Sequence, residues 1–150
     1  MDYTFDDFLK TVEPQHKAFA ESMHKELIAN GYKAAIESKA TGFFIGYKHP
    51  KTKRSLMNFL FRKKGLLVRI YPASKTPIIP NAVTEGMIKE IDKAITCKMC
   101  SEKCIKGYKF AINDQAYDKC HYGAFLFVVS EESKPVIAKW VKTEIEENQQ

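Results

Sequence analysis

Apolar residues at helical spacing mark the first thirty residues of the chain. Pro14 suits the first turn of a helix, and Phe19, Met23 and Leu27 then recur every four positions. Gly31 follows where a C-terminal cap belongs, so a helix is predicted from Pro14 to just before this glycine. A shorter helix over residues 4–12 precedes it, with a buried face made of Phe5, Phe8 and Leu9.

Between residues 32 and 71, apolar residues recur at every second position, a spacing that predicts strands. Residues 32–37 form one candidate strand, and three later segments each place alternate apolar side chains on one face. These faces are Phe43, Ile45 and Tyr47; Met57, Phe59 and Phe61; and Leu66, Val68 and Ile70. Arg62–Gly65 has the character of a tight hairpin turn, with Gly65 free to adopt a positive φ. Links this short indicate an antiparallel meander, because a parallel crossover needs about a dozen residues or more.

The second half of the chain predicts two helices and a hairpin. One helix spans about residues 81–96, and strands over 107–112 and 122–129 are joined by a turn at 113–115. The last helix begins near Ser133. Its apolar stripe consists of Val136, Ile137, Trp140, Val141 and Ile145.

The composition fits one α+β domain spanning residues 1–150. Apolar residues make up 45% of the chain and charged residues 28%, which is an ordinary balance for a globular protein. The predicted fold is an antiparallel sheet flanked by N-terminal, middle and C-terminal helices, with a cysteine-rich hairpin held by a metal.

The N-terminus carries no recognisable targeting signal. Residues 1–7 are acidic and lack the basic start and apolar stretch of a signal peptide. The longest apolar run, residues 123–129, is far shorter than the roughly 20 residues that span a bilayer. We therefore expect a cytoplasmic protein without a membrane partner, whose thiols are kept reduced.

All four cysteines fall within one short segment. We predict that residues 97–121 form a metal-binding subregion. Two residues separate the first pair, three separate the second pair, and fifteen precede the last cysteine. Four thiolates match the tetrahedral coordination of structural zinc, and a pair separated by two residues reaches one ion from a single turn. The predicted ligands are Cys97, Cys100, Cys104 and Cys120, with His121 as a substitute ligand.

Three other interpretations of the cysteines stay open. They include free, partly buried thiols without a metal, and an iron–sulfur cluster, although the spacing matches neither common ferredoxin run. The third is a redox pair of Cys97 and Cys100. That motif normally begins a helix, where the dipole lowers the pKa of the thiol, whereas here the pair follows a helix end.

The positive charge of the chain belongs to one segment. Residues 38–84 contain ten Lys or Arg and no acidic residue, whereas residues 1–37 contain four against seven. Lys and Arg attract phosphates, and exposed aromatic rings on a sheet stack bases, so this segment is a candidate surface for nucleic acid or another anionic partner. The candidate residues are Lys48, Lys51, Lys53, Arg54, Arg62, Lys63, Lys64 and Arg69.

A simpler interpretation of the same segment is a solvated sheet face. An antiparallel sheet with one wet side is polar there, lysines protect its edges, and the interleaved rings fill the core. These rings are Phe44, Tyr47, Phe59, Phe61 and Tyr71.

Two segments resemble small cysteine-containing proteins of Gram-positive anaerobes whose function is uncharacterised. One runs Cys104-Ile-Lys-Gly107-Tyr108-Lys-Phe110 and continues at Tyr117-Asp-Lys-Cys120. The other runs Asn58-Phe-Leu-Phe-Arg62-Lys-Lys-Gly65-Leu-Leu-Val-Arg69-Ile-Tyr71. This resemblance implies no activity.

The predicted order of helix, antiparallel sheet and closing helix is similar to YdhG-like domains, some of which are frataxin-like iron chaperones. Iron binding in that group relies on an acidic ridge, whereas the corresponding segment here has no acid. The resemblance therefore concerns architecture and does not imply iron donation.

Nothing in the sequence carries a catalytic motif. The chain contains no P-loop, G-x-G-x-x-G, H-E-x-x-H or G-x-S-x-G pattern. The hypothesis is a zinc-stabilised binding module that contacts nucleic acid or another anionic partner through its basic sheet, and the sequence leaves open whether the protein is an enzyme. The alternative is a thiol-dependent enzyme or redox protein that uses the cysteine cluster.

Overall fold

A computed structural model describes residues 3–71, 85–93, 108–112, 115–119 and 124–147 of the chain. The elements are α1 (Phe5–Leu9), α2 (Pro14–Ala29), β1 (Lys33–Lys39), β2 (Gly42–Lys48), β3 (Ser55–Arg62), β4 (Gly65–Ile70), α3 (Glu85–Lys93), β5 (Tyr108–Ile112), β6 (Gln115–Lys119), β7 (Phe125–Val128) and α4 (Lys134–Glu147). The α+β class predicted from the sequence is confirmed.

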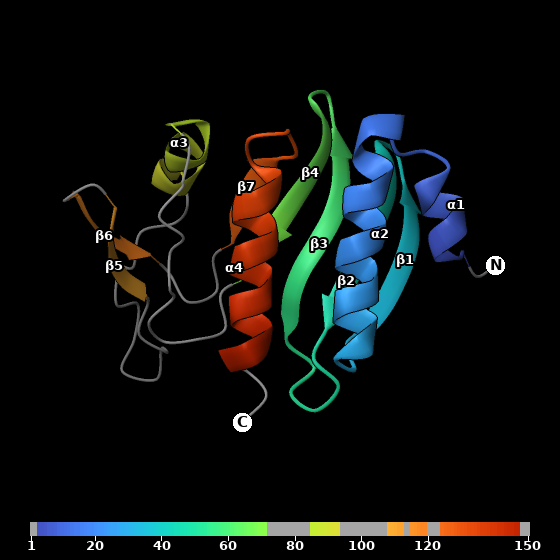
Figure 1. The fold of residues 1–150 in the computed structure, drawn as a ribbon, viewed down its shortest axis with the longest axis horizontal. Coiled ribbons are helices and arrows are strands. Elements are labelled where there is room, and N and C mark those ends of the chain that lie inside the picture. Colours follow the sequence, from blue (N-terminus) through green and yellow to red (C-terminus); the bar gives the residue numbers. More distant parts are fainter. Residues whose placement is uncertain (1–2, 72–84, 94–107, 113–114, 120–123, 148–150) are drawn as a thin grey trace.

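The main sheet has five antiparallel strands in the order β1-β2-β3-β4-β7. Helices α1, α2 and α4 pack on one side of it, and α3 lies beside the β7 edge (Figure 1). We call the side under α1, α2 and α4 the first face, and the opposite side the second face. The first four strands pair in chain order and form the predicted meander. Their apolar sides face the helices.

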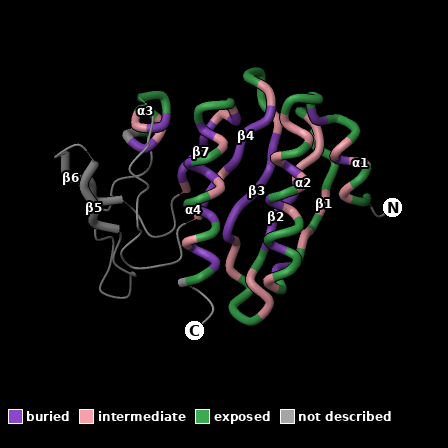
Figure 2. The backbone as a smooth tube through the Cα atoms, in the orientation of Figure 1, coloured by how far each residue is buried: buried purple, intermediate pink, exposed green. Residues whose placement is uncertain are grey.

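Most of the core lies between the helices and the first face, although Leu56, Leu60 and Leu67, which alternate with the inward-pointing residues, are buried too. It includes every apolar residue that the strand pattern placed inward, with Phe43 and Phe61 only partly buried. Trp140 of α4 is fully buried and its ring lies 5.5 Å from that of Phe125 and 5.7 Å from that of Phe127. Burial is concentrated on β3, β4 and the inner sides of α2 and α4 (Figure 2).

Turn residues set the strand connections as predicted. Gly65 has φ +101°, a left-handed conformation that its position in the hairpin between β3 and β4 requires. The link between β2 and β3 lies at the other end of the sheet, after a register shift at Tyr47 and Lys48 (Figure 1). The two basic turns of the sequence are therefore separated by the length of β3.

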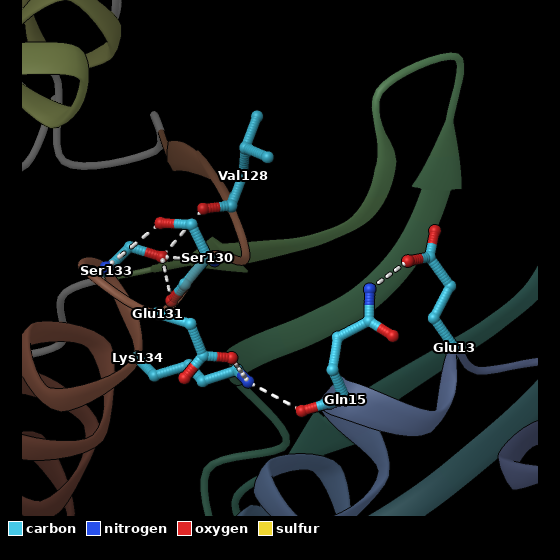
Figure 3. Close-up of polar contacts among 7 residues, drawn as sticks. All are labelled: Glu13, Gln15, Val128, Ser130, Glu131, Ser133 and Lys134. Atoms are coloured by element: carbon cyan, nitrogen blue, oxygen red, sulfur yellow. Dashed lines mark hydrogen bonds and ion pairs between the residues drawn. The ribbon is translucent and has the colours of Figure 1, made fainter.

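Polar contacts join the starts of α2 and α4. The ammonium of Lys134 donates to the carbonyl oxygen of Gln15 at 2.7 Å and pairs with the Glu131 carboxylate at 2.5 Å (Figure 3). The Ser130 and Ser133 side chains each accept a hydrogen bond from the other's backbone N–H, at 3.1 and 2.9 Å. These contacts fix the helix that the sequence predicted to begin near Ser133.

The predicted hairpin over residues 107–129 is wrong in its pairing. β5 pairs with β6 in a separate two-stranded sheet, and β7 pairs with β4 as the fifth strand of the main sheet. Phe125 and Phe127 explain the placement of β7, because their buried rings need the helix-covered face of a large sheet. The sequence of β6, Gln-Ala-Tyr-Asp-Lys, carries too little apolar alternation to be recognised as a strand.

The middle helix is confirmed over Glu85–Lys93, with Met87 and Ile91 buried. The predicted helix spans residues 81–96, and its parts at 81–84 and 94–96 lie outside the described residues. Within the part of the chain that is described, no helix combines the length and the apolar character needed to cross a bilayer.

Candidate anion-binding surface

Strand register determines which basic residues share the second face. Because side chains alternate along a strand, the residues between the inward-pointing ones point to the second face. Antiparallel pairing places Asn58 opposite both Gly46 and Arg69, and places Phe44 opposite Glu37. The second face therefore carries an aromatic ring, an amide and a guanidinium on adjacent strands.

A depression of about 330 Å³ lies at the end of this face near the turn between β3 and β4. We call it the basic depression. Its lining residues are Lys39, Thr41, Gly42, Phe43, Phe44, Leu60, Phe61, Arg62 and Arg69. Three strands thus each contribute cations to one concave surface: β1 gives Lys39, β3 gives Arg62 and β4 gives Arg69.

The charge of the basic depression is positive but partly balanced. Lys39 pairs with Glu37 at 3.0 Å, and both side chains are more than half exposed, so water screens this pair strongly. Arg62 is exposed and Arg69 is partly buried. The lining residues of the depression include no carboxylate. The Glu37 carboxylate, the partner of Lys39, is not among them. The depression therefore presents a net positive surface to an anion.

Phe44 is the aromatic residue of the basic depression. Its Cε1 atom would lie 3.4 Å from a β-carbon added to Gly46, so the ring leans along β2 over this glycine. The ammonium of Lys39 lies over the ring, 5.9 Å from its centroid, within cation–π range. Phe44 stays partly exposed in this position.

Three other rings of the basic segment belong to the core or its margin. Tyr47 and Phe59 are fully buried on the first face, and Phe61 packs partly buried against them. The Phe59 ring contacts those of Phe8, Phe19 and Tyr47, and the Phe61 ring contacts that of Phe8. For these residues the simpler interpretation of the sequence, rings as core, is the correct one.

The structure divides the predicted basic residues into separate groups. Arg62 and Arg69 line the basic depression, and Lys63 and Lys64 lie exposed in the adjoining turn. The residues at the opposite end of the sheet are Lys48, Lys51, Lys53 and Arg54. The basic segment therefore forms two groups at opposite ends of the sheet, in keeping with the two basic turns of the sequence.

A second and larger depression, of about 580 Å³, lies between α3 and the turn from β7 to α4. Lys64 and Phe127 are among its lining residues. Its charged side chains are Lys64, Lys89, Lys93, Glu85, Glu90 and Glu132, so cations and carboxylates are equal in number. This balance of charge favours neither an anionic nor a cationic ligand.

A histidine and a tyrosine meet beneath α1. Nδ1 of His24 lies 2.8 Å from the Tyr47 hydroxyl oxygen, and the His24 ring stacks on Phe5 at 3.8 Å between centroids. Burial lowers the pKa of His24 and raises the pKa of Tyr47. Both groups therefore favour their neutral forms and share one hydrogen bond, which makes this pair a structural contact rather than a proton-transfer site.

The predicted metal ligands Cys97, Cys100, Cys104 and Cys120, together with His121, lie outside the described residues. Within the described ranges, no group of three His, Cys, Asp or Glu side chains is placed to hold a metal ion.

Sequence reasoning missed two residues of this region. Lys39 reaches the basic depression because a two-residue link, Ala40 and Thr41, pairs it with Gly42 across the hairpin. That short link is the signal by which Lys39 was recognisable. Asn58 is only 4% exposed on the second face, and a buried amide has no signature in the alternation of apolar residues.

Comparisons of the chain with protein-family models, with curated proteins and with solved structures found no match.

Proposed function

We propose that this protein is a zinc-stabilised binding module that contacts nucleic acid through the basic depression. The observation that carries the proposal is that Lys39, Arg62 and Arg69, from three different strands, line one depression together with the ring of Phe44. Cations held on a sheet at one end of a concave surface suit the spaced negative charges of a phosphate backbone.

The two arginines give the surface its capacity to bind phosphate. A guanidinium is always charged and presents a planar fork of donors that matches phosphate oxygens in pairs. Arg69 stands on a strand with β3 on one side and β7 on the other, so its backbone is held in place. A cation fixed in this way loses less conformational entropy on binding than one on a free loop.

Zinc enters the proposal from the cysteine spacing alone. Four thiolates from Cys97 to Cys120 fit a structural site in which every coordination position is taken by the protein. Such a site stabilises the fold and leaves binding to other residues. We therefore assign the metal a structural role and the basic depression the binding role.

A salt titration tests the proposal. Fluorescence anisotropy of a labelled single-stranded oligothymidylate, measured at rising salt, gives the slope of log K against log[salt]. Three phosphate contacts predict a slope of about −2, since each contact on a single strand contributes roughly −0.7. A lack of binding at low salt, or a slope near zero, would overturn the proposal.

A further inference from the structure

Gly46 determines how the Phe44 ring lies on the second face. A β-carbon at position 46 would lie 3.3 Å from Oδ1 of Asn58 and 3.4 Å from Cε1 of Phe44. Both distances are tighter than ordinary carbon contacts, so a side chain there would displace the ring or the amide. The glycine leaves the ring room to lean over the strand.

The Phe44 ring already receives a cation. Lys39 lies over it at 5.9 Å from the centroid, and its other partner is the exposed carboxylate of Glu37 at 3.0 Å. Lys39 makes both contacts with a long side chain that is about half exposed. Another group therefore displaces it at small cost. A planar group stacked on Phe44 would replace Lys39 and leave its ammonium free for a phosphate.

From this arrangement we infer that Phe44 is a stacking residue for an unpaired nucleobase, so that the basic depression binds single strands. The inference rests on the proposed function and specifies its ligand. A base stacks on an aromatic ring exposed on a sheet, while neighbouring cations hold the flanking phosphates. Arg62 and Arg69 line the same depression as the ring and supply those cations.

Duplexes fit this surface less well. In a duplex the bases stack on one another, and reaching Phe44 would require a base to leave the helix at a cost of a few kcal/mol. A single strand has free base faces and avoids that cost. The partly exposed ring therefore favours single strands over duplexes of the same length and charge.

Two probes separate base stacking from phosphate attraction. One is a fluorescein-labelled oligothymidylate, and the other is a labelled abasic strand of the same length, which keeps the phosphates and lacks the bases. We expect the unaltered protein to bind the oligothymidylate roughly tenfold more tightly, the effect of one stacked base. Phe44→Leu should remove this difference between the two probes, whereas Phe44→Trp should restore it.

The outcomes separate the inference from the function on which it rests. If the unaltered protein binds both probes equally, Phe44 does not stack a base, and phosphate binding through the basic depression still stands. Equal weakening of both probes by Phe44→Leu, in a variant whose thermal unfolding matches the unaltered protein, also overturns the inference. If neither probe binds at low salt, the proposed function fails and the inference fails with it.

Discussion

Arg62 and Lys48 lie at opposite ends of the sheet, although both belong to one basic stretch of the sequence. Lys48 ends β2 and is paired with Ser55 at the start of β3, whereas Arg62 ends β3. The seven steps along β3 that separate Ser55 from Arg62 amount to roughly 23 Å at the usual rise per residue. A ligand shorter than this distance that is held at Arg62 therefore does not contact Lys48, and an oligothymidylate that short is the probe for comparing the two ends.

The hydrogen bond between His24 and Tyr47 predicts a loss of stability in mild acid. Burial lowers the pKa of His24 in the folded state, so the unfolded chain binds more protons below its ordinary pKa of about 6.5. The stabilising contribution is complete above that value and is lost as the pH falls through it toward the folded-state pKa. Urea unfolding at several pH values measures the effect.

The matched variant for this experiment is His24→Gln, which keeps a polar side chain without a group that titrates in this range. We expect its free energy of unfolding to depend less on pH between about 7 and 5 than that of the unaltered protein. Identical pH profiles for the two proteins would contradict the account of the pair.

Gly65 predicts a second change in stability. Its φ of +101° disfavours any residue with a β-carbon. Among the described residues, a β-carbon there would meet Glu13 Oε1 at an ordinary 3.6 Å and nothing closer. Gly65→Ala should therefore lower the free energy of unfolding by about 1 kcal/mol or more, through backbone strain alone. Urea denaturation followed by circular dichroism gives the value.

The control for this variant is Gly86→Ala. Gly86 lies exposed inside α3, where alanine is the better helix former. This change should raise stability by roughly 0.5–1 kcal/mol. A loss of stability at position 86, or none at position 65, would show that the backbone conformations differ from those described.

Features of the fold that depend on residues close together in the sequence could be predicted from it. Pro14 and Gly31 bound α2 closely, and alternation placed Ile45, Phe59 and Val68 on the buried face. These features depend on neighbours along the chain, for which spacing is a direct signal.

What the sequence did not predict depends on pairing between distant segments. β7 joins β4, more than fifty residues earlier, and nothing in the spacing of Phe125 and Phe127 names that partner. The convergence of Arg62 and Arg69 on one depression follows from strand pairing, which composition cannot express. Lys39 enters the binding surface for the same reason.

The cysteine proposal predicts a metal stoichiometry. Native mass spectrometry should give the mass of the chain plus one zinc ion, and a chelator should remove it with a loss of stability. Cys100→Ser should abolish zinc binding and lower the thermal unfolding temperature. A mass equal to the chain with four free thiols contradicts the proposal. Retention of metal and stability after alkylation of one cysteine would favour a thiol-dependent enzyme instead.

The central claim is that the basic depression, rather than total charge, binds nucleic acid. Two charge-reversed proteins test it: Arg62→Glu with Arg69→Glu, and Lys48→Glu with Lys51→Glu at the far end of the sheet. Each pair lowers the net charge by four, from +6 to +2. Circular dichroism establishes that both variants are folded, so any difference in binding reflects position.

The measurement is the dissociation constant of each protein for the labelled oligothymidylate at one low salt concentration. The Arg62 and Arg69 reversal should weaken binding by roughly tenfold or more, because it removes phosphate contacts and places carboxylates in the site. The Lys48 and Lys51 reversal should leave binding close to that of the unaltered protein. Equal losses in the two variants would contradict the claim, since binding would then follow net charge alone.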